Sequence, residues 1–161
     1  MPYGSNDWLA LTQEPALKPD LPICDPHHHF WDNRPASFPY QRYLLHELND
    51  DIYSGHNVVS TVFLEARSMY SADVDEGLRS VGEVEFVQGL AAASASGVYG
   101  TSRAAAGIMG HADLKLGADV KPILEARSEE HTSELQSLVK IVCRRLLDKK
   151  KNKRRDERAD K

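Results

Sequence analysis

Three short apolar runs alternate with segments of helical periodicity, and this order limits the folds that the chain can adopt. The second run is dominated by β-branched residues, mainly valine, which predicts a strand buried on both faces of a sheet. Strands are predicted over residues 21–25, 57–66 and 104–109. Helices are predicted over residues 42–54 and 82–95, and from Val120 onward, where apolar residues recur every three or four positions. Strict alternation of strand and helix indicates an α/β fold with parallel strands.

Polar residues stand where each predicted strand ends. The first strand ends at Asp25, just before three histidines, the second closes on Glu65, and the third is followed by His111. In α/β barrels the active site gathers at the C-terminal ends of the strands. The sequence therefore indicates Asp25, Glu65 and His111 as candidate catalytic residues. Cys24 precedes Asp25 on a strand predicted to be buried, so we expect it to pack in the core rather than act as a nucleophile.

The histidine cluster is the most informative motif, and residues 25–32 read Asp-Pro-His-His-His-Phe-Trp-Asp. Side chains two residues apart share a face of an extended strand, so His27 and His29 should point one way and His28 the other. Two imidazoles on one side suit a divalent metal such as Zn²⁺, bound at about 2.0–2.1 Å per nitrogen. Asp25 would share that face, as a further ligand or an orienting partner. A solvated loop is the competing interpretation, because two histidines cannot complete a metal site.

The arrangement Asp-x-His-x-His after a first short strand resembles the opening motif of the amidohydrolase superfamily. Residues 25–32 are especially similar to the amidohydrolase-related branch, also called amidohydrolase 2. That branch includes sugar-lactone and dicarboxylate-lactone hydrolases and some decarboxylases. The resemblance continues through residues 59–65 and 106–114, and it covers roughly residues 5–126.

This resemblance implies a (β/α)₈ TIM barrel, which takes about 250 residues, so the chain would supply about three of its eight strand–helix units. It implies that His27 and His29 bind the metal, expected to be zinc, although some lactonases of the branch work without a metal. Asp25 would orient these ligands, and Glu65 and His111 would line the pocket. Activated water would then attack a lactone, ester or amide carbonyl of a small-molecule substrate. We expect this chain alone to be inactive, since later ligands and the general base are missing.

The charge balance changes abruptly at Arg127. Residues 1–126 hold 8 Lys and Arg against 17 Asp and Glu, a net charge of −9, whereas residues 127–161 have a net charge of +5. Residues 127–137 resemble a translated sequencing adapter, residues 142–147 resemble a later part of the same adapter, and the lysine run 149–151 is what poly-A encodes. We therefore expect a barrel-type domain over residues 21–126, and a tail over residues 127–161 that does not belong to it.

Other function classes are less well supported by the sequence. Residues 1–20 contain Pro15 and Pro19 and show little periodicity, which predicts an irregular arm without a secretory signal. The two cysteines form no disulfide framework, and no apolar run is long enough to span a bilayer, so a cytoplasmic enzyme without a membrane partner is expected. A metal-dependent decarboxylase of the same branch is one alternative. The other is a basic-tailed nucleic-acid-binding protein, although the tail has no aromatic residue for base stacking, so no nucleic-acid partner is expected.

Overall fold

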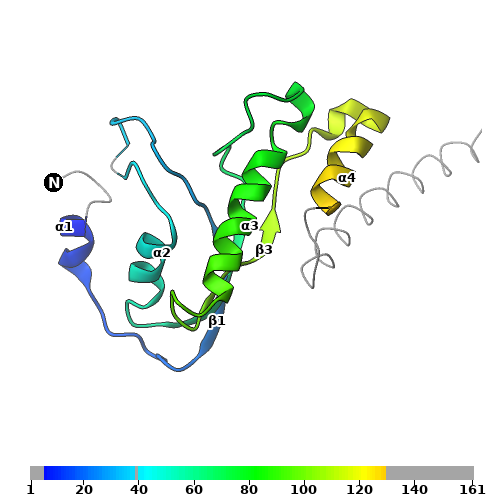
Figure 1. Ribbon diagram of the computed structural model, residues 1–161. Helices are drawn as coiled ribbons and strands as arrows, with labels where there is room; N and C mark the ends of the chain where they lie inside the picture. Colours follow the sequence, from blue (N-terminus) through cyan, green and yellow to red (C-terminus); the bar gives the residue numbers. More distant parts are fainter. Residues whose placement is uncertain (1–5, 39, 130–161) are drawn as a thin grey trace, which may run out of the picture.

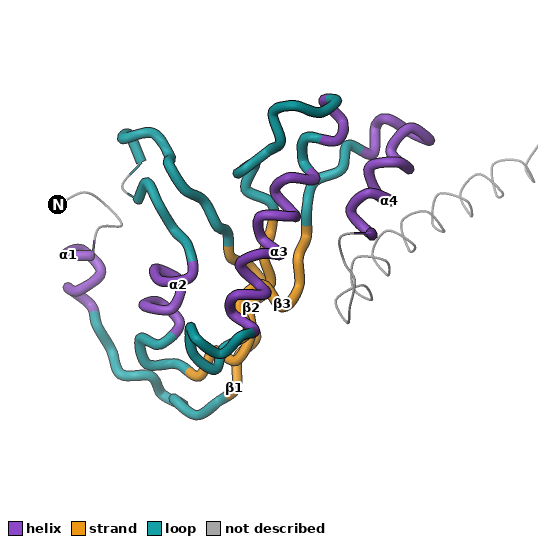
Figure 2. The backbone as a smooth tube through the Cα atoms, in the orientation of Figure 1, coloured by secondary structure: helices purple, strands orange, loops and turns teal. Residues whose placement is uncertain are grey.

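The computed structural model describes residues 6–38 and 40–129, which form an α/β arrangement around one small sheet (Figures 1 and 2). The three strands are parallel, and they lie in the order β1-β2-β3. The strands are β1 (Pro22–His28), β2 (Asn57–Leu64) and β3 (Arg103–Met109). The α-helices are α1 (Asn6–Leu9), α2 (Leu45–Ile52), α3 (Val81–Ala95) and α4 (Lys121–Glu129), and the 3₁₀ turns are η1 (Ala10–Thr12), η2 (Glu76–Leu78) and η3 (Leu114–Val120). The predicted alternation of parallel strands with helices is confirmed.

Several element boundaries differ from the predicted ones. Strand β1 continues to His28, so the histidine cluster begins inside the strand rather than after it. Pro26 is accommodated because β1 is an edge strand whose register with β2 is irregular between Asp25 and His28. The expectation of an irregular N-terminal arm was wrong for residues 6–12, which form α1 and η1. These residues contain neither proline nor glycine, and the next proline along the chain is Pro15.

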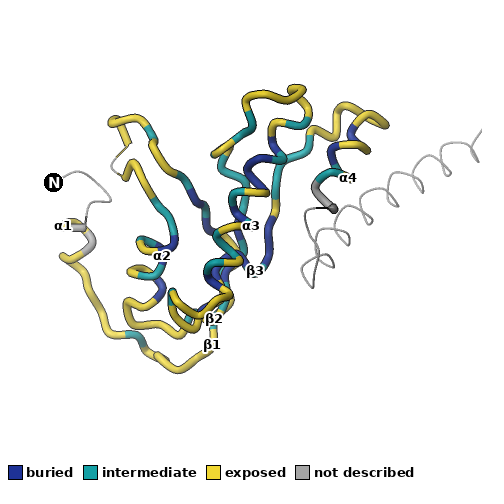
Figure 3. Tube along the Cα trace, in the orientation of Figure 1, coloured by how far each residue is buried: buried dark blue, intermediate teal, exposed yellow. Residues whose placement is uncertain are grey.

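One hydrophobic core fills the space between the helices and the sheet, where the buried residues gather along α3 and the strands behind it (Figure 3). Thr61 and Phe63 of β2 are fully buried, whereas Val62 and Leu64, on the other face of the strand, are only partly buried. The prediction that β2 is buried on both faces was therefore wrong, because the helices cover one face of the described sheet. The core residues are Phe30, Leu45, Leu48, Ile52, Phe63, Val84, Val87, Ala104, Ala105 and Ile108.

The outer strand β1 is open to solvent over much of its length. Cys24 was expected to pack inside the protein, but its side chain is exposed, because β1 has a neighbour on one side only in the described sheet.

The boundary predicted at Arg127 falls inside α4, and the predicted helix over residues 133–148 and the basic run lie outside the described residues. In the part of the chain that the structure describes, no helix has the length and apolar character needed to cross a membrane.

The turn before β3 is attached to the end of α2 by Tyr53. The phenolic oxygen of Tyr53 accepts hydrogen bonds from the backbone N–H groups of Thr101 (3.0 Å) and Ser102 (3.1 Å). Gly100 lies directly beside this phenol with a φ of +114°, and a Cβ atom there would meet the Tyr53 oxygen at 2.3 Å. Only glycine adopts this backbone conformation without strain while leaving room for the phenol.

We expect Gly100→Ala to lower the free energy of unfolding by about 1–3 kcal/mol, because it adds both backbone strain and a steric overlap. The matched control is Gly89→Ala in the middle of α3, where a Cβ would meet no atom within 4 Å. That control should instead raise stability by about 0.5–1 kcal/mol, since alanine is the better helix former. Urea unfolding followed by circular dichroism measures both, and equal effects would contradict the role given to Gly100.

Candidate metal and substrate site

The rings of His27 and His29 meet at the C-terminal end of β1. Their Nε2 atoms are 3.2 Å apart, and the rings are nearly perpendicular, with an interplanar angle of 88°. His28 is 7% exposed and packs against Phe30 and Phe63 in the core. His27 and His29 thus lie together and His28 lies apart, as the alternation of an extended strand predicts.

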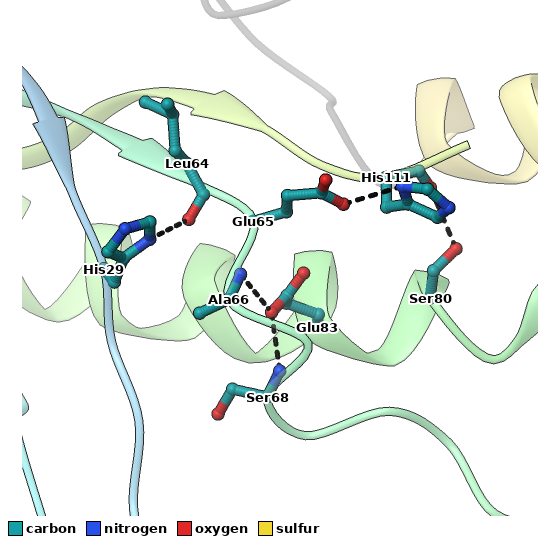
Figure 4. A network of polar contacts seen from close by, with 8 residues as sticks. All are labelled: His29, Leu64, Glu65, Ala66, Ser68, Ser80, Glu83 and His111. Carbon is teal, nitrogen blue, oxygen red and sulfur yellow. Dashed lines mark hydrogen bonds and ion pairs between the residues drawn. The ribbon is translucent and has the colours of Figure 1, made fainter. Parts of the chain in front are cut away.

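The orientation of His29 is fixed by the neighbouring strand. Its Nδ1 lies 2.9 Å from the carbonyl oxygen of Leu64, the last residue of β2 (Figure 4). A carbonyl can only accept a hydrogen bond, so Nδ1 carries the hydrogen, and Nε2 of the neutral ring keeps its lone pair. A backbone carbonyl on the remote ring nitrogen is a common arrangement for a metal-binding histidine.

The spacing of the two Nε2 atoms fits a shared metal ion. Two nitrogens bound at about 2.0–2.1 Å with a tetrahedral angle between them stand about 3.3–3.4 Å apart, close to the distance found between His27 and His29. A complete zinc site needs at least three protein ligands. Among the residues that the structure describes, no three His, Cys, Asp or Glu side chains come together to hold a metal ion. His27 and His29 therefore offer two ligands of a site that needs another.

Asp25 contacts the backbone of the motif. Its Oδ1 accepts a hydrogen bond of 3.1 Å from the backbone N–H of His27, across the irregular part of β1. The Asp25 carboxylate therefore supports the local backbone around Pro26, whereas the ring of His29 is oriented by Leu64.

Glu65 and His111 are brought together at the ends of the next two strands. Glu65 follows β2 directly, and its Oε2 lies 2.9 Å from Nδ1 of His111, which follows β3. The hydroxyl of Ser80 donates a hydrogen bond of 3.0 Å to the backbone carbonyl of His111. Both members of the pair are partly exposed, at 40% and 39%. Figure 4 shows His29, Glu65 and His111 following one another along this edge of the sheet, so these three predicted residues lie on one side of the molecule.

Glu83, on α3, stabilises the turn at this edge of the sheet, and it was not predicted from the sequence as part of the site. It lies in α3 and is fully buried, and its Oε1 accepts hydrogen bonds from the backbone N–H groups of Ala66 (2.9 Å) and Ser68 (2.7 Å). These bonds fix the turn that begins directly after Glu65. One feature of the sequence pointed to it: Glu83 stands four residues before Val87, on the apolar face of a predicted helix. A carboxyl group buried on such a face needs hydrogen-bond partners.

A hollow of about 560 Å³ opens between β1 and α2, next to the histidine pair. Its lining is mostly apolar and also includes carboxylates, a phenol and imidazoles. The lining residues are Ile23, Asp25, Pro26, His27, His28, His29, Trp31, Tyr43, Leu48, Asp51, Ile52, His56 and Val58. Burial lowers the pKa of His28 from 6.5 to about 4, so this imidazole is neutral at physiological pH.

No family model, curated protein or solved structure matches the chain. The geometry of the strand ends and the motif resemblance are therefore the basis for a function. The other two histidines of the described residues, His46 and His56, are exposed. His131 of the tail lies outside the described residues.

Proposed function

We propose that the chain is the N-terminal part of a metal-dependent hydrolase of the amidohydrolase type, built on a TIM barrel. The substrate would be a small molecule with a lactone, ester or amide carbonyl. The observation that carries this proposal is the convergence of the Nε2 atoms of His27 and His29, with His29 held by the Leu64 carbonyl. Three parallel strands in sequential order, with polar residues at their C-terminal ends, support the barrel.

In this proposal His27 and His29 hold a divalent metal, and zinc suits their nitrogen ligands best. A metal bound there would polarise the substrate carbonyl and activate water for attack on it. The chain's own residues provide orientation: Leu64 leaves the His29 lone pair on Nε2, and Asp25 fixes the backbone of the motif. Glu65 accepts a hydrogen bond from Nδ1 of His111, which leaves Nε2 of His111 able to accept a proton from the substrate side.

The proposal is tested by titrating the untagged full chain with Zn²⁺ in a calorimeter. Cys24 and Cys143 are first replaced by serine, so that their thiolates do not compete for zinc. Because the described residues bring only two ligands together, we expect weak binding of one zinc per chain. We expect His27→Ala and His29→Ala each to weaken it further by about tenfold or more, which corresponds to about 1.4 kcal/mol.

The matched control is His46→Ala, since His46 is an exposed imidazole on α2 whose ring contacts Tyr99. It should leave the zinc affinity unchanged. Zinc binding that survives both His27→Ala and His29→Ala would contradict the assignment of the ligands. An equally large loss of zinc affinity in His46→Ala would show that zinc does not bind specifically at the end of β1.

A further inference from the structure

The histidine pair at the end of β1 is open to other molecules. His27 is exposed and His29 is half-buried, whereas His28 between them packs into the core. In the described sheet β1 is an outer strand with a neighbour on one side only, and both histidines also line the hollow beside it. A second molecule can therefore approach His27 and His29 from the open side of β1.

A zinc ion held by this pair would have two ligand positions left. Zinc in proteins is almost always surrounded by four ligands in a tetrahedron, and His27 and His29 supply two of them. Within the described residues no third His, Cys, Asp or Glu side chain joins the pair. A second copy of the chain carries the same two imidazoles, so two copies together supply four nitrogen ligands.

The geometry of the pair suits a symmetric arrangement of two copies. All edges of a tetrahedron are equal, so the spacing of about 3.3–3.4 Å that two zinc-bound nitrogens require is the same for both pairs. The Nε2 atoms of His27 and His29 are 3.2 Å apart, and the Leu64 carbonyl holds the His29 ring with Nε2 free to bind. A two-fold axis through the metal exchanges the two pairs, so both copies use the same surface, as in the commonest class of dimer.

The charges around the pair make this association depend on the metal. Asp25 is next to the pair, with its Oδ1 3.1 Å from the backbone nitrogen of His27, and no lysine or arginine lines the adjacent hollow. Two copies would bring two Asp25 carboxylates together, and each full chain has a net charge of −4. Without a metal these charges repel, whereas the two positive charges of one zinc ion offset the two carboxylates.

We propose that one zinc ion joins two copies of this chain through His27 and His29 of each copy. The dimer forms when zinc is scarce relative to the chain, because sharing one ion gives it four imidazole ligands. In a large excess of zinc each copy takes its own ion, and the dimer separates. This inference rests on the proposed function for the identity of the two ligands, and it adds the partner that completes their site.

The test is sedimentation velocity of the untagged full chain, with Cys24 and Cys143 replaced by serine, at increasing Zn²⁺. We expect the mass of a monomer without zinc, that of a dimer at half an equivalent, and that of a monomer again in large excess. Addition of EDTA to the dimer should restore the monomer. His27→Ala or His29→Ala each removes two of the four ligands, so the dissociation constant of the dimer should rise by about a hundredfold, or about tenfold per lost ligand.

His46→Ala is the matched control on the described surface, and His131→Ala tests the segment outside the described residues. Both should leave the dimer unchanged. A dimer that forms without zinc, or that persists in His27→Ala and His29→Ala, would overturn the proposal.

The outcomes also separate this proposal from the proposed function. A monomer at half an equivalent, in a sample whose ¹⁵N NMR spectrum shows zinc on both His27 and His29, would overturn the shared site alone. Zinc that reaches neither histidine would contradict the metal site itself, and the zinc-bridged dimer with it.

Discussion

Replacing Glu83 by alanine is expected to lower the free energy of unfolding by about 2–4 kcal/mol, because two backbone N–H groups would lose their hydrogen bonds to the carboxyl oxygen of a fully buried side chain. Those groups belong to Ala66 and Ser68, at 2.9 and 2.7 Å from Oε1. Glu83→Gln keeps the Oε1 acceptor and should cost less. The exposed neighbour Glu85 provides the matched control, and Glu85→Ala should change stability by no more than about 0.5 kcal/mol.

Urea unfolding measures the global effect of Glu83→Ala, and amide hydrogen exchange locates it. In the variant, the amides of Ala66 and Ser68 should exchange much faster than in the unmodified chain, while amides in β3 keep their relative protection. If Glu83→Ala and Glu85→Ala were equally stable, the buried carboxylate would not hold the turn after β2. Because this turn follows Glu65 immediately, we expect Glu83→Ala also to change the position of the Glu65 side chain.

Burial of His28 is expected to make the protein less stable in mild acid by up to about 3 kcal/mol. The pKa of His28 falls from 6.5 to about 4 in the folded chain, so the unfolded chain takes up a proton first as the pH drops. The stabilisation is complete above pH 6.5, declines as the pH falls, and is lost at about pH 4. Urea unfolding in metal-free buffer at pH 7 and pH 5 should show a difference of about 2 kcal/mol from this residue.

His28→Phe separates this contribution from the titration of carboxylates over the same range. The new ring cannot titrate, and it would lie beside Phe30 and Phe63, which already contact His28 with ring centroids 4.7 and 5.9 Å away. We expect the variant to be at least as stable as the parent chain at pH 7 and to lose less stability at pH 5. Identical pH dependence in the two proteins would mean that His28 is not buried as described.

The sequence predicted those parts of the fold that depend on local patterns. The valine-rich run gave the position of β2, and the spacing of Val84, Val87 and Leu90 gave the position of α3. The order of these elements along the chain was enough to predict a parallel sheet. Because parallel strands end at the same edge, it also predicted that Glu65 and His111 would lie on one side of the molecule, where Oε2 of Glu65 lies 2.9 Å from Nδ1 of His111.

The contacts that orient the site could not be predicted in this way, because they join residues far apart in sequence through groups that carry no sequence signal. The acceptor for His29 is a backbone carbonyl, which is the same group at every residue, and it lies 35 positions away at Leu64. The stacking of Arg34 on Trp31 and Phe38 depends on how the loop returns to Tyr43. The degree of burial of β2 and Cys24 depends on which neighbours the sheet has, and the local pattern does not specify that.

The central claim is that His27 and His29 bind one metal ion through their Nε2 atoms. Its most direct test is ¹⁵N NMR of the histidine rings in the untagged chain during addition of Zn²⁺. We expect the Nε2 signals of both residues to shift together and saturate at one zinc per chain, while Nδ1 of His29 keeps its hydrogen toward Leu64. Shifts confined to His46 and His56, or ligation of His29 through Nδ1, would contradict the claim.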